Sequence, residues 1–372
     1  MGAIYLIDGI GPFFRGLQRR TINWSKIPFD HLCMEPGVER DAQWAQIRED
    51  LGRFARKVKG IGYNSVSLDD VSHLGDCRAY DADTRVLIAA YREEFRRCFA
   101  LLRELDLQVY VTMDFFSAPV SMTREGLDPT RFTVELLDSF LTDFPEVSGV
   151  IVRIGEADGR DVQDHFRSEL KVRTPEEANE LLKALLPVFE KHQRRLIFRT
   201  WTVGAYPVGD LMWHRDTFRR VLDGLESQQL VVSMKYGESD FFRHLPLNKN
   251  FFRTKVAKII ELQTRREYEG CGEYPSFTGW EYERYIQELR HAENVVGCMV
   301  WCQTGGWVPF RRLAFIDDAA VWTEMNTFVT LKMLRDGVLA EEAVREFARE
   351  RGGVDAHALL ELLRLADEVI RD

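Results

Sequence analysis

The residues of this 372-residue chain that could do chemistry gather at the ends of apolar runs. The clearest run lies within residues 149–159, where Gly-Val-Ile-Val-Arg-Ile-Gly is followed at once by Glu156. If the run is a buried strand, a carboxylate just past its end is placed as catalytic groups are in α/β-barrel enzymes. The alternative is that Glu156 is a solvated loop residue or caps the next element.

The other apolar runs also end in polar or aromatic residues, which are Asp8, Asp69 with Asp70, Asp114, Arg199 with Trp201, Lys235, Arg265 with Glu267, and Trp301 with Gln303. Arg199 and Lys235 lie inside apolar runs, and burying an unpaired charge costs roughly several kcal/mol. Each therefore needs a partner or an anionic ligand. Paired carboxylates hydrolyse glycosides and indoles stack on sugar faces, so the set is typical of a glycosidase. The cations indicate a sugar that carries its own carboxylate.

Elements of alternating type must position these residues. Apolar and β-branched runs predict eight strands, over 4–8, 63–70, 107–114, 147–155, 195–202, 230–237, 258–265 and 296–303. Helical periodicity predicts helices over 41–60, 85–105, 132–144, 174–192, 216–225, 280–292 and 318–334. The segment 240–253, after the sixth strand, is poor in helical period. Repeated βα units imply parallel strands joined by helical crossovers.

Eight such units predict an α/β fold of the (β/α)8 TIM-barrel type over residues 1–338. Two further helices, over 341–351 and 356–371, predict a C-terminal helical extension at 339–372. The alternative is a doubly wound open sheet. It is disfavoured as a nucleotide-binding fold because no glycine-rich phosphate loop follows the first strand.

Composition excludes several classes of protein. The net charge of −9 leaves no basic excess for nucleic acid, and no apolar run is long enough to span a membrane. The N-terminus lacks the basic region of a signal peptide, so a cytoplasmic protein is expected. The six cysteines form no CxxC pair and the eight histidines are dispersed, which predicts reduced thiols, no metal site and no cofactor. The oligomeric state is open, with a homodimer as one option.

Two segments resemble motifs of glycoside hydrolase family 67, the α-glucuronidases. Lys235-Tyr-Gly-Glu-Ser-Asp240-Phe241 is similar to the family's Lys-x-Gly-x-x-Asp-Phe. Residues 263–270, Gln-Thr-Arg-Arg-Glu-Tyr-Glu-Gly, are similar to its Gln-x-x-x-Glu-Tyr-x-Gly. The order and the interval agree, and the resemblance covers about residues 63–303.

The resemblance implies roles for individual residues. Glu156 would be the general acid, and Asp240 and Glu267 would share the general base of an inverting hydrolase. Arg199 and Lys235 would bind the uronate carboxylate of an oligosaccharide or glycoside. Val152 stands where the family has a lysine, so Arg153 is its candidate substitute.

Three alternatives stay open beside this reading. Asp240 and Glu267 could offset the two cations structurally, without a ligand. Trp201 and Trp301, assigned to substrate binding, could be core indoles. The barrel could also hydrolyse another sugar, or bind carbohydrate without catalysis, although a binding module would not need three carboxylates.

Overall fold

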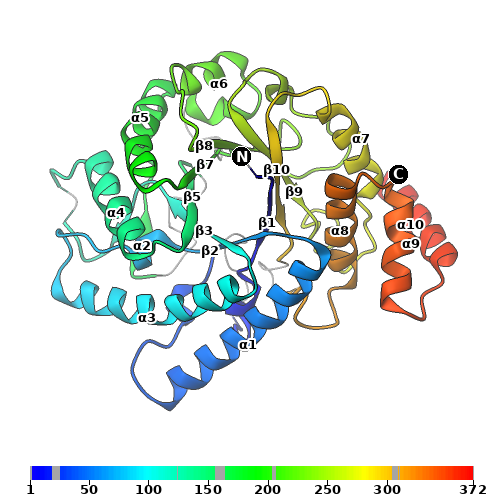
Figure 1. Cartoon of the computed structure of the whole chain (residues 1–372), viewed down its shortest axis with the longest axis horizontal. Helices are drawn as coiled ribbons and strands as arrows, with labels where there is room; N and C mark the ends of the chain where they lie inside the picture. Colours follow the sequence, from blue (N-terminus) through cyan, green and yellow to red (C-terminus); the bar gives the residue numbers. More distant parts are fainter. Residues whose placement is uncertain are drawn as a thin grey trace.

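A computed structural model describes residues 2–18, 26–123, 125–155, 164–202, 207–303, 309 and 311–371 of the chain. Its centre is a closed barrel of eight parallel strands in the spatial order β1-β10-β9-β8-β7-β5-β3-β2 (Figure 1). The strands are β1 (Ile4–Asp8), β2 (Ser65–Leu68), β3 (Gln108–Asp114), β5 (Val147–Arg153), β7 (Arg195–Arg199), β8 (Leu230–Lys235), β9 (Ala257–Gln263) and β10 (Val295–Trp301). The predicted barrel is confirmed. Several strands end earlier than predicted, and β5 stops at Arg153 rather than Gly155.

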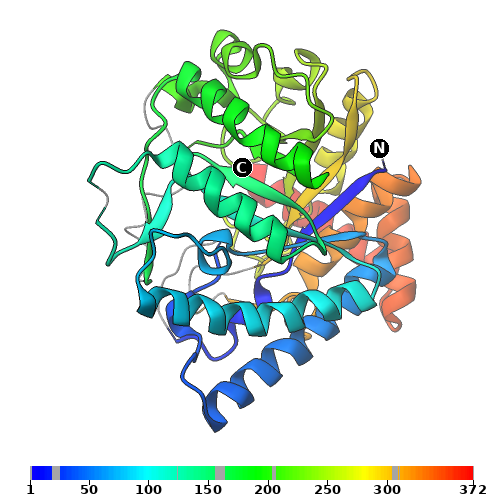
Figure 2. The ribbon, with the colours of Figure 1, turned by 60° about the vertical axis from the view of Figure 1, so that its left-hand side comes forward.

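Helices form a ring around the strands, as Figure 1 shows and as Figure 2 shows from another side. The longer ones are α1 (Val38–Ile61), α3 (Ala82–Glu104), α4 (Pro129–Asp143), α5 (Pro175–His192), α6 (Arg215–Leu222), α7 (Gly279–Leu289) and α8 (Val321–Leu331). Each of these helices overlaps a helix predicted from the sequence. α5 begins with a capping box, in which Thr174 and Glu177 bond each other's backbone N–H groups and satisfy two donors of the first turn.

The connection between β8 and β9 differs from the other connections of the barrel. This connection holds a single 3-10 turn, η4 (Lys249–Phe252), rather than an α-helix. The weak helical period of residues 240–253 is consistent with this finding. The connection is therefore free to fold as an irregular segment, and it carries Asp240.

The barrel closes where the first strand meets the last. β1 pairs with β10 in a register that places Ile4 beside Gly297. Gly297 has φ +146°, and a Cβ atom there would lie 1.8 Å from the carbonyl oxygen of Ile4, so this seam requires glycine. At the other end of the seam, buried Asp8 accepts the backbone N–H groups of Cys302 at 2.6 Å and Gln303 at 3.2 Å.

Two short elements were not predicted. β4 (Ser117–Pro119) and β6 (Phe166–Ser168) form an antiparallel pair outside the barrel, and α2 (Val71–Leu74) is a single turn after β2. Segments of three or four residues are too short to give a periodic signal.

The C-terminal helices α9 (Ala340–Arg351) and α10 (Ala356–Arg371) lie outside the ring (Figure 1). α9 packs against α7 and α8, and α10 packs against α9. The boundary at residue 338 stays a prediction. Among the described residues, every helix is too short or too polar to cross a bilayer.

Candidate active site

The carboxyl ends of all eight strands meet at one end of the barrel, because the strands are parallel. The predicted residues Arg153, Arg199, Trp201, Lys235, Asp240, Glu267 and Trp301 therefore lie at this end. Glu156, the predicted acid, lies outside the described residues. Its place follows the end of β5 by three residues.

Arg199, the last residue of β7, forms a buried ion pair with Glu261 of β9. Its Nε lies 2.9 and 3.0 Å from the two carboxylate oxygens, and its Nη2 lies 2.5 Å from Oε1. Glu261 also accepts hydrogen bonds from Ser233 Oγ at 3.1 Å and Trp301 Nε1 at 2.8 Å. Burial alone would raise the pKa of Glu261, but the charge and hydrogen bonds of Arg199 bring it below its usual value. Glu261 is therefore ionised.

Lys235, the last residue of β8, is held by one carboxylate and two aromatic rings. Its Nζ lies 2.5 Å from Asp240 Oδ1, 3.4 Å from the centre of the Trp201 ring and 4.2 Å from that of Phe241. Burial lowers the pKa of Lys235 to about 8, although Asp240 opposes the shift. Lys235 is thus mostly charged at neutral pH, and its charge disappears in the mildly alkaline range.

Asp240 lies in the irregular segment after β8, where three donors surround its carboxylate. Besides Lys235, it accepts the Tyr268 hydroxyl at 2.5 Å and the backbone N–H of Phe241 at 2.8 Å. Burial raises its pKa, but Lys235 and Tyr268 outweigh burial and leave the pKa below its usual value. The Asp240 side chain keeps 22% of its surface exposed, so a water molecule or a substrate can reach it.

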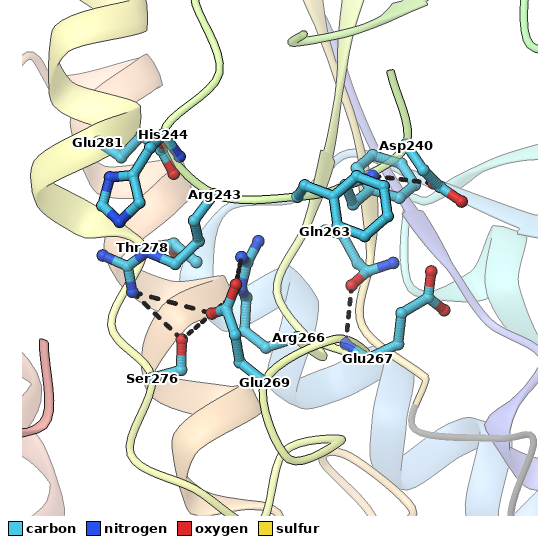
Figure 3. Close-up of polar contacts among 12 residues, drawn as sticks. Asp240, Arg243, His244, Gln263, Arg266, Glu267, Glu269, Ser276, Thr278 and Glu281 are labelled. Atoms are coloured by element: carbon cyan, nitrogen blue, oxygen red, sulfur yellow. Dashed lines mark hydrogen bonds and ion pairs between the residues drawn. The ribbon is translucent and has the colours of Figure 1, made fainter. Parts of the chain in front are cut away.

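Glu267 lies in the loop after β9, on the same side of the Gln263 side chain as Asp240 (Figure 3). Its backbone N–H donates to Gln263 Oε1 at 3.0 Å, and its carboxylate lies 2.9 Å from Arg265 Nη2. Tyr268, the next residue, bonds Asp240. The loops that carry Asp240 and Glu267, which were predicted to share the base, are therefore neighbours connected through Tyr268.

A second polar cluster occupies the ends of β2, β3 and β5. Arg153 Nε lies 2.8 Å from Asp114, which also pairs with Lys26. A cavity of about 20 Å³ adjoins Arg153, and its wall includes Asp69 and His73. A cavity of this size has room for about one water molecule. Arg153, the last residue of β5, thus lies on the wall of this cavity with the Asp114 carboxylate beside it.

One sequence-based expectation needs correction. Glu261, which offsets the charge of Arg199, was missed, whereas Glu267 pairs with Arg265 instead. Asp240 does offset Lys235, as the structural alternative proposed. The signal for Glu261 was present, because it lies two residues before Gln263 on β9 and therefore on the same face of the strand.

The two indoles differ in what they can contact. Trp301 is 2% exposed, donates to Glu261, and has the Arg199 guanidinium 4.9 Å from its ring centre. Trp201 is half-buried and covers Lys235. Trp301 thus supports the floor of the site, and Trp201 has the surface that a sugar could meet. No cluster of metal-ligating residues occurs in the part of the chain that the structure describes.

Comparisons with known proteins show which family and which fold this chain is similar to. Residues 37–300 match the model of the glycosyl hydrolase family 67 middle domain. A probable α-glucuronidase A of Aspergillus flavus is 27% identical over 242 residues, which cover 60% of this chain and 26% of that protein. An α-glucuronidase of Hypocrea jecorina is 25% identical over 239 residues, with the same coverage. The chain thus matches about a quarter of the length of these relatives.

Among solved structures, a GH138 enzyme targeting pectin rhamnogalacturonan II is similar to this chain. The TM-score is 0.57 at 13% identity, and the match covers 97% of this chain and 43% of that one. At this level of identity the similarity concerns the fold.

Proposed function

Because this chain belongs to glycosyl hydrolase family 67, we propose that it hydrolyses glycosides of an α-linked glucuronic acid and inverts the anomeric centre. The observation that supports the proposal is that Asp240 and Glu267 lie on neighbouring loops at the mouth of the barrel, each paired with a buried cation. Two carboxylates on one side of a sugar can hold and deprotonate the attacking water.

In this mechanism Asp240 and Glu267 act on the water, and Glu156 protonates the leaving oxygen. Ionised Asp240 accepts a proton, while Tyr268 and Lys235 fix its orientation by hydrogen bonds. An inverting reaction needs room for that water, so we expect the Glu156 carboxyl about 6.5–9.5 Å from the base pair. A separation of about 5 Å would instead indicate a retaining enzyme.

The uronate carboxylate would interact with Lys235 and Arg199, and the sugar ring would lie against Trp201. Lys235 supports this assignment because burial makes its charge costly, and an anionic ligand would offset that cost. Charge-assisted hydrogen bonds of this kind contribute about 1.5–3 kcal/mol each.

A second candidate is a hydrolase of the same barrel class that acts on a neutral sugar. The observation that favours it is that Arg199 and Lys235 already have carboxylate partners, Glu261 and Asp240. Their charges are therefore compensated without a uronate. The two candidates differ in the charge of the substrate that they prefer.

The test is to measure hydrolysis of aldouronic oligosaccharides, aryl α-uronides and the matching neutral glycosides, with NMR of the first anomer released. We expect turnover of the uronide with release of the β-anomer. A preference for the neutral glycoside would support the second candidate, and release of the α-anomer would exclude inversion.

A further inference from the structure

Four buried charges connect helix α10 to the two loops that carry Asp240 and Glu267. In order they are Arg266, Glu269, Arg243 and Asp367, and they are called the charge chain below. Arg266 Nε lies 3.0 Å from Glu269 Oε2, and Arg243 Nη1 lies 3.8 Å from the same oxygen. Arg243 Nη2 pairs with Asp367 Oδ1 in the last turns of α10. Figure 3 shows the part formed by Arg243, Glu269 and Arg266.

The four members of the charge chain are buried. They are two guanidinium groups and two carboxylates, and each side chain keeps 10% or less of its surface exposed. The exposed Arg371 of α10 pairs with the other oxygen of Asp367 at 2.7 Å. Ser276 links the same groups, since its hydroxyl bonds Glu269 and accepts from Arg243 Nη1 at 3.3 Å. Neutralising one member leaves its partner incompletely compensated in a site with little water, so the arrangement should be sensitive to a single charge.

The charge chain lies next to the base pair in sequence and in space. Arg243 follows Asp240 by three residues, and Glu269 follows Glu267 by two. Between these positions the loops touch directly, because the rings of Phe242 and Tyr268 are 4.4 Å apart and the Tyr268 hydroxyl bonds Asp240. The ion pair of Arg243 with Glu269 therefore adds a buried link to the contacts between the two loops.

Helix α10 contacts both loops. Asp367 holds Arg243 of the β8–β9 connection, and the carbonyl oxygen of Ala366 accepts the Tyr274 hydroxyl of the loop after β9 at 2.9 Å. The segment 339–372 lies beyond the matched family region, residues 37–300. Helix α10 thus contacts both loops of the proposed base pair, although it follows all the proposed reacting groups in the sequence.

We propose that Asp367 is a positioning residue, through which α10 and the charge chain fix the relative placement of Asp240 and Glu267. The effect on catalysis rests on the function proposed above, but the effect on the loops does not. A merely structural Asp367 would instead stabilise the attachment of α10 and leave the two loops unchanged in the folded protein.

Hydrogen–deuterium exchange of the full chain separates these two roles without any substrate. Asp367→Asn removes the charge and keeps the shape, and we expect amide exchange in residues 240–245 and 265–276 to become about tenfold faster. Glu341→Gln is the matched control, because Glu341 forms an ion pair with Arg364 of α10 at 2.7 Å, away from the loops. Unchanged exchange in both loops of Asp367→Asn would overturn the proposal.

Two further variants keep the test decisive if Asp367→Asn folds poorly. Asp367→Glu retains the charge and should restore slow exchange in both loops. Tyr274→Phe removes the other contact to α10 and should accelerate exchange in residues 265–276 alone. Failure of both expectations would exclude a positioning role for α10.

Kinetics on the uronide provide the second readout. Asp367→Asn should lower kcat about tenfold or more while KM changes less than about threefold, because placement of the base and not ground-state binding is lost. Arg243→Gln combined with Asp367→Asn should be no slower than Arg243→Gln alone, as expected if the residues act through each other. If the wild type hydrolyses no uronide, the proposed function fails, and the exchange experiment still decides this proposal.

Discussion

Arg199 and Glu261 lie on strands separated by β8, yet their side chains form a bidentate ion pair across the lumen of the barrel. Ser233 of the intervening strand and Trp301 of β10 bond the same carboxylate. One glutamate thus connects four adjacent strands beneath the site, β7 to β10. Its loss should affect both stability and the shape of the floor.

We expect Glu261→Gln to lower the free energy of unfolding by about 3–5 kcal/mol, because it leaves the Arg199 charge buried without its partner. Urea unfolding followed by circular dichroism measures this. Glu176→Gln removes an exposed ion pair with Arg220 and should scarcely change stability. The double variant Arg199→Met with Glu261→Gln should recover part of the loss, and equal losses in all three would contradict the assignment.

Glu156→Gln should abolish hydrolysis of uronides with poor leaving groups and preserve much of the hydrolysis of an activated aryl uronide. The reason is that a phenol of low pKa leaves without protonation, whereas an alcohol needs the acid. Rates on the two substrates, measured beside a circular dichroism spectrum, provide the test. Equal losses on both would remove Glu156 from the acid role.

The binding of a uronide should weaken as the pH rises through about 8. Lys235 has its pKa lowered to about 8 by burial, so it is charged below that pH and neutral above it. KM for the uronide should therefore rise between pH 7 and 9, and the rise should vanish in Lys235→Met. Lys258→Met is the matched control and should keep the rise in KM. Burial also lowers the pKa of Lys258 to about 8, but this residue lies at the start of β9, away from the mouth of the barrel. The idea fails if KM is flat in the wild type.

His73 should stabilise the fold at neutral pH and lose that effect in alkali. Although burial opposes the charge, Asp164 at 2.7 Å and Asp70 raise the pKa of His73 to about 9. A raised pKa means that the contribution is complete below about 6.5, the unfolded value, and declines as the pH rises to 9.

Unfolding free energies at pH 6, 7.5 and 9 check this expectation. The fall across the window should be at most about 3 kcal/mol in the wild type and should be clearly smaller in Asp164→Asn, which keeps only the Asp70 contact. His357→Gln, at an exposed position of α10, should behave as the wild type does. An identical decline in wild type and Asp164→Asn would show that other groups cause it.

Local patterns were sufficient to predict the barrel. β-Branched runs and helical periods depend on neighbours within a few residues, so they located all eight strands and the helices between them. The same patterns placed Lys235 at the end of β8. The resemblance to family 67 singled out Asp240, whose interval of five residues from Lys235 allows contact through a turn.

The partners that come from distant segments could not be predicted in this way. Glu261 meets Arg199 because of the strand order of the closed barrel, and Asp367 meets Arg243 across more than a hundred residues of chain. A list of strand ends also omits residues in the middle of a strand. Such pairs become visible once the topology is known.

The seam between Ile4 and Gly297 has a consequence for biosynthesis. The two residues are about 290 positions apart, so at 5–20 residues per second the ribosome needs roughly 15–60 seconds to make β10 after β1. During that interval β1 can pair with β2 but presents its other edge unpaired. Nascent chains should therefore present an unpaired strand edge, which can pair with other chains, until β10 has been made. Abundant chaperone should therefore increase the yield of folded protein more than changes at the mouth of the barrel do.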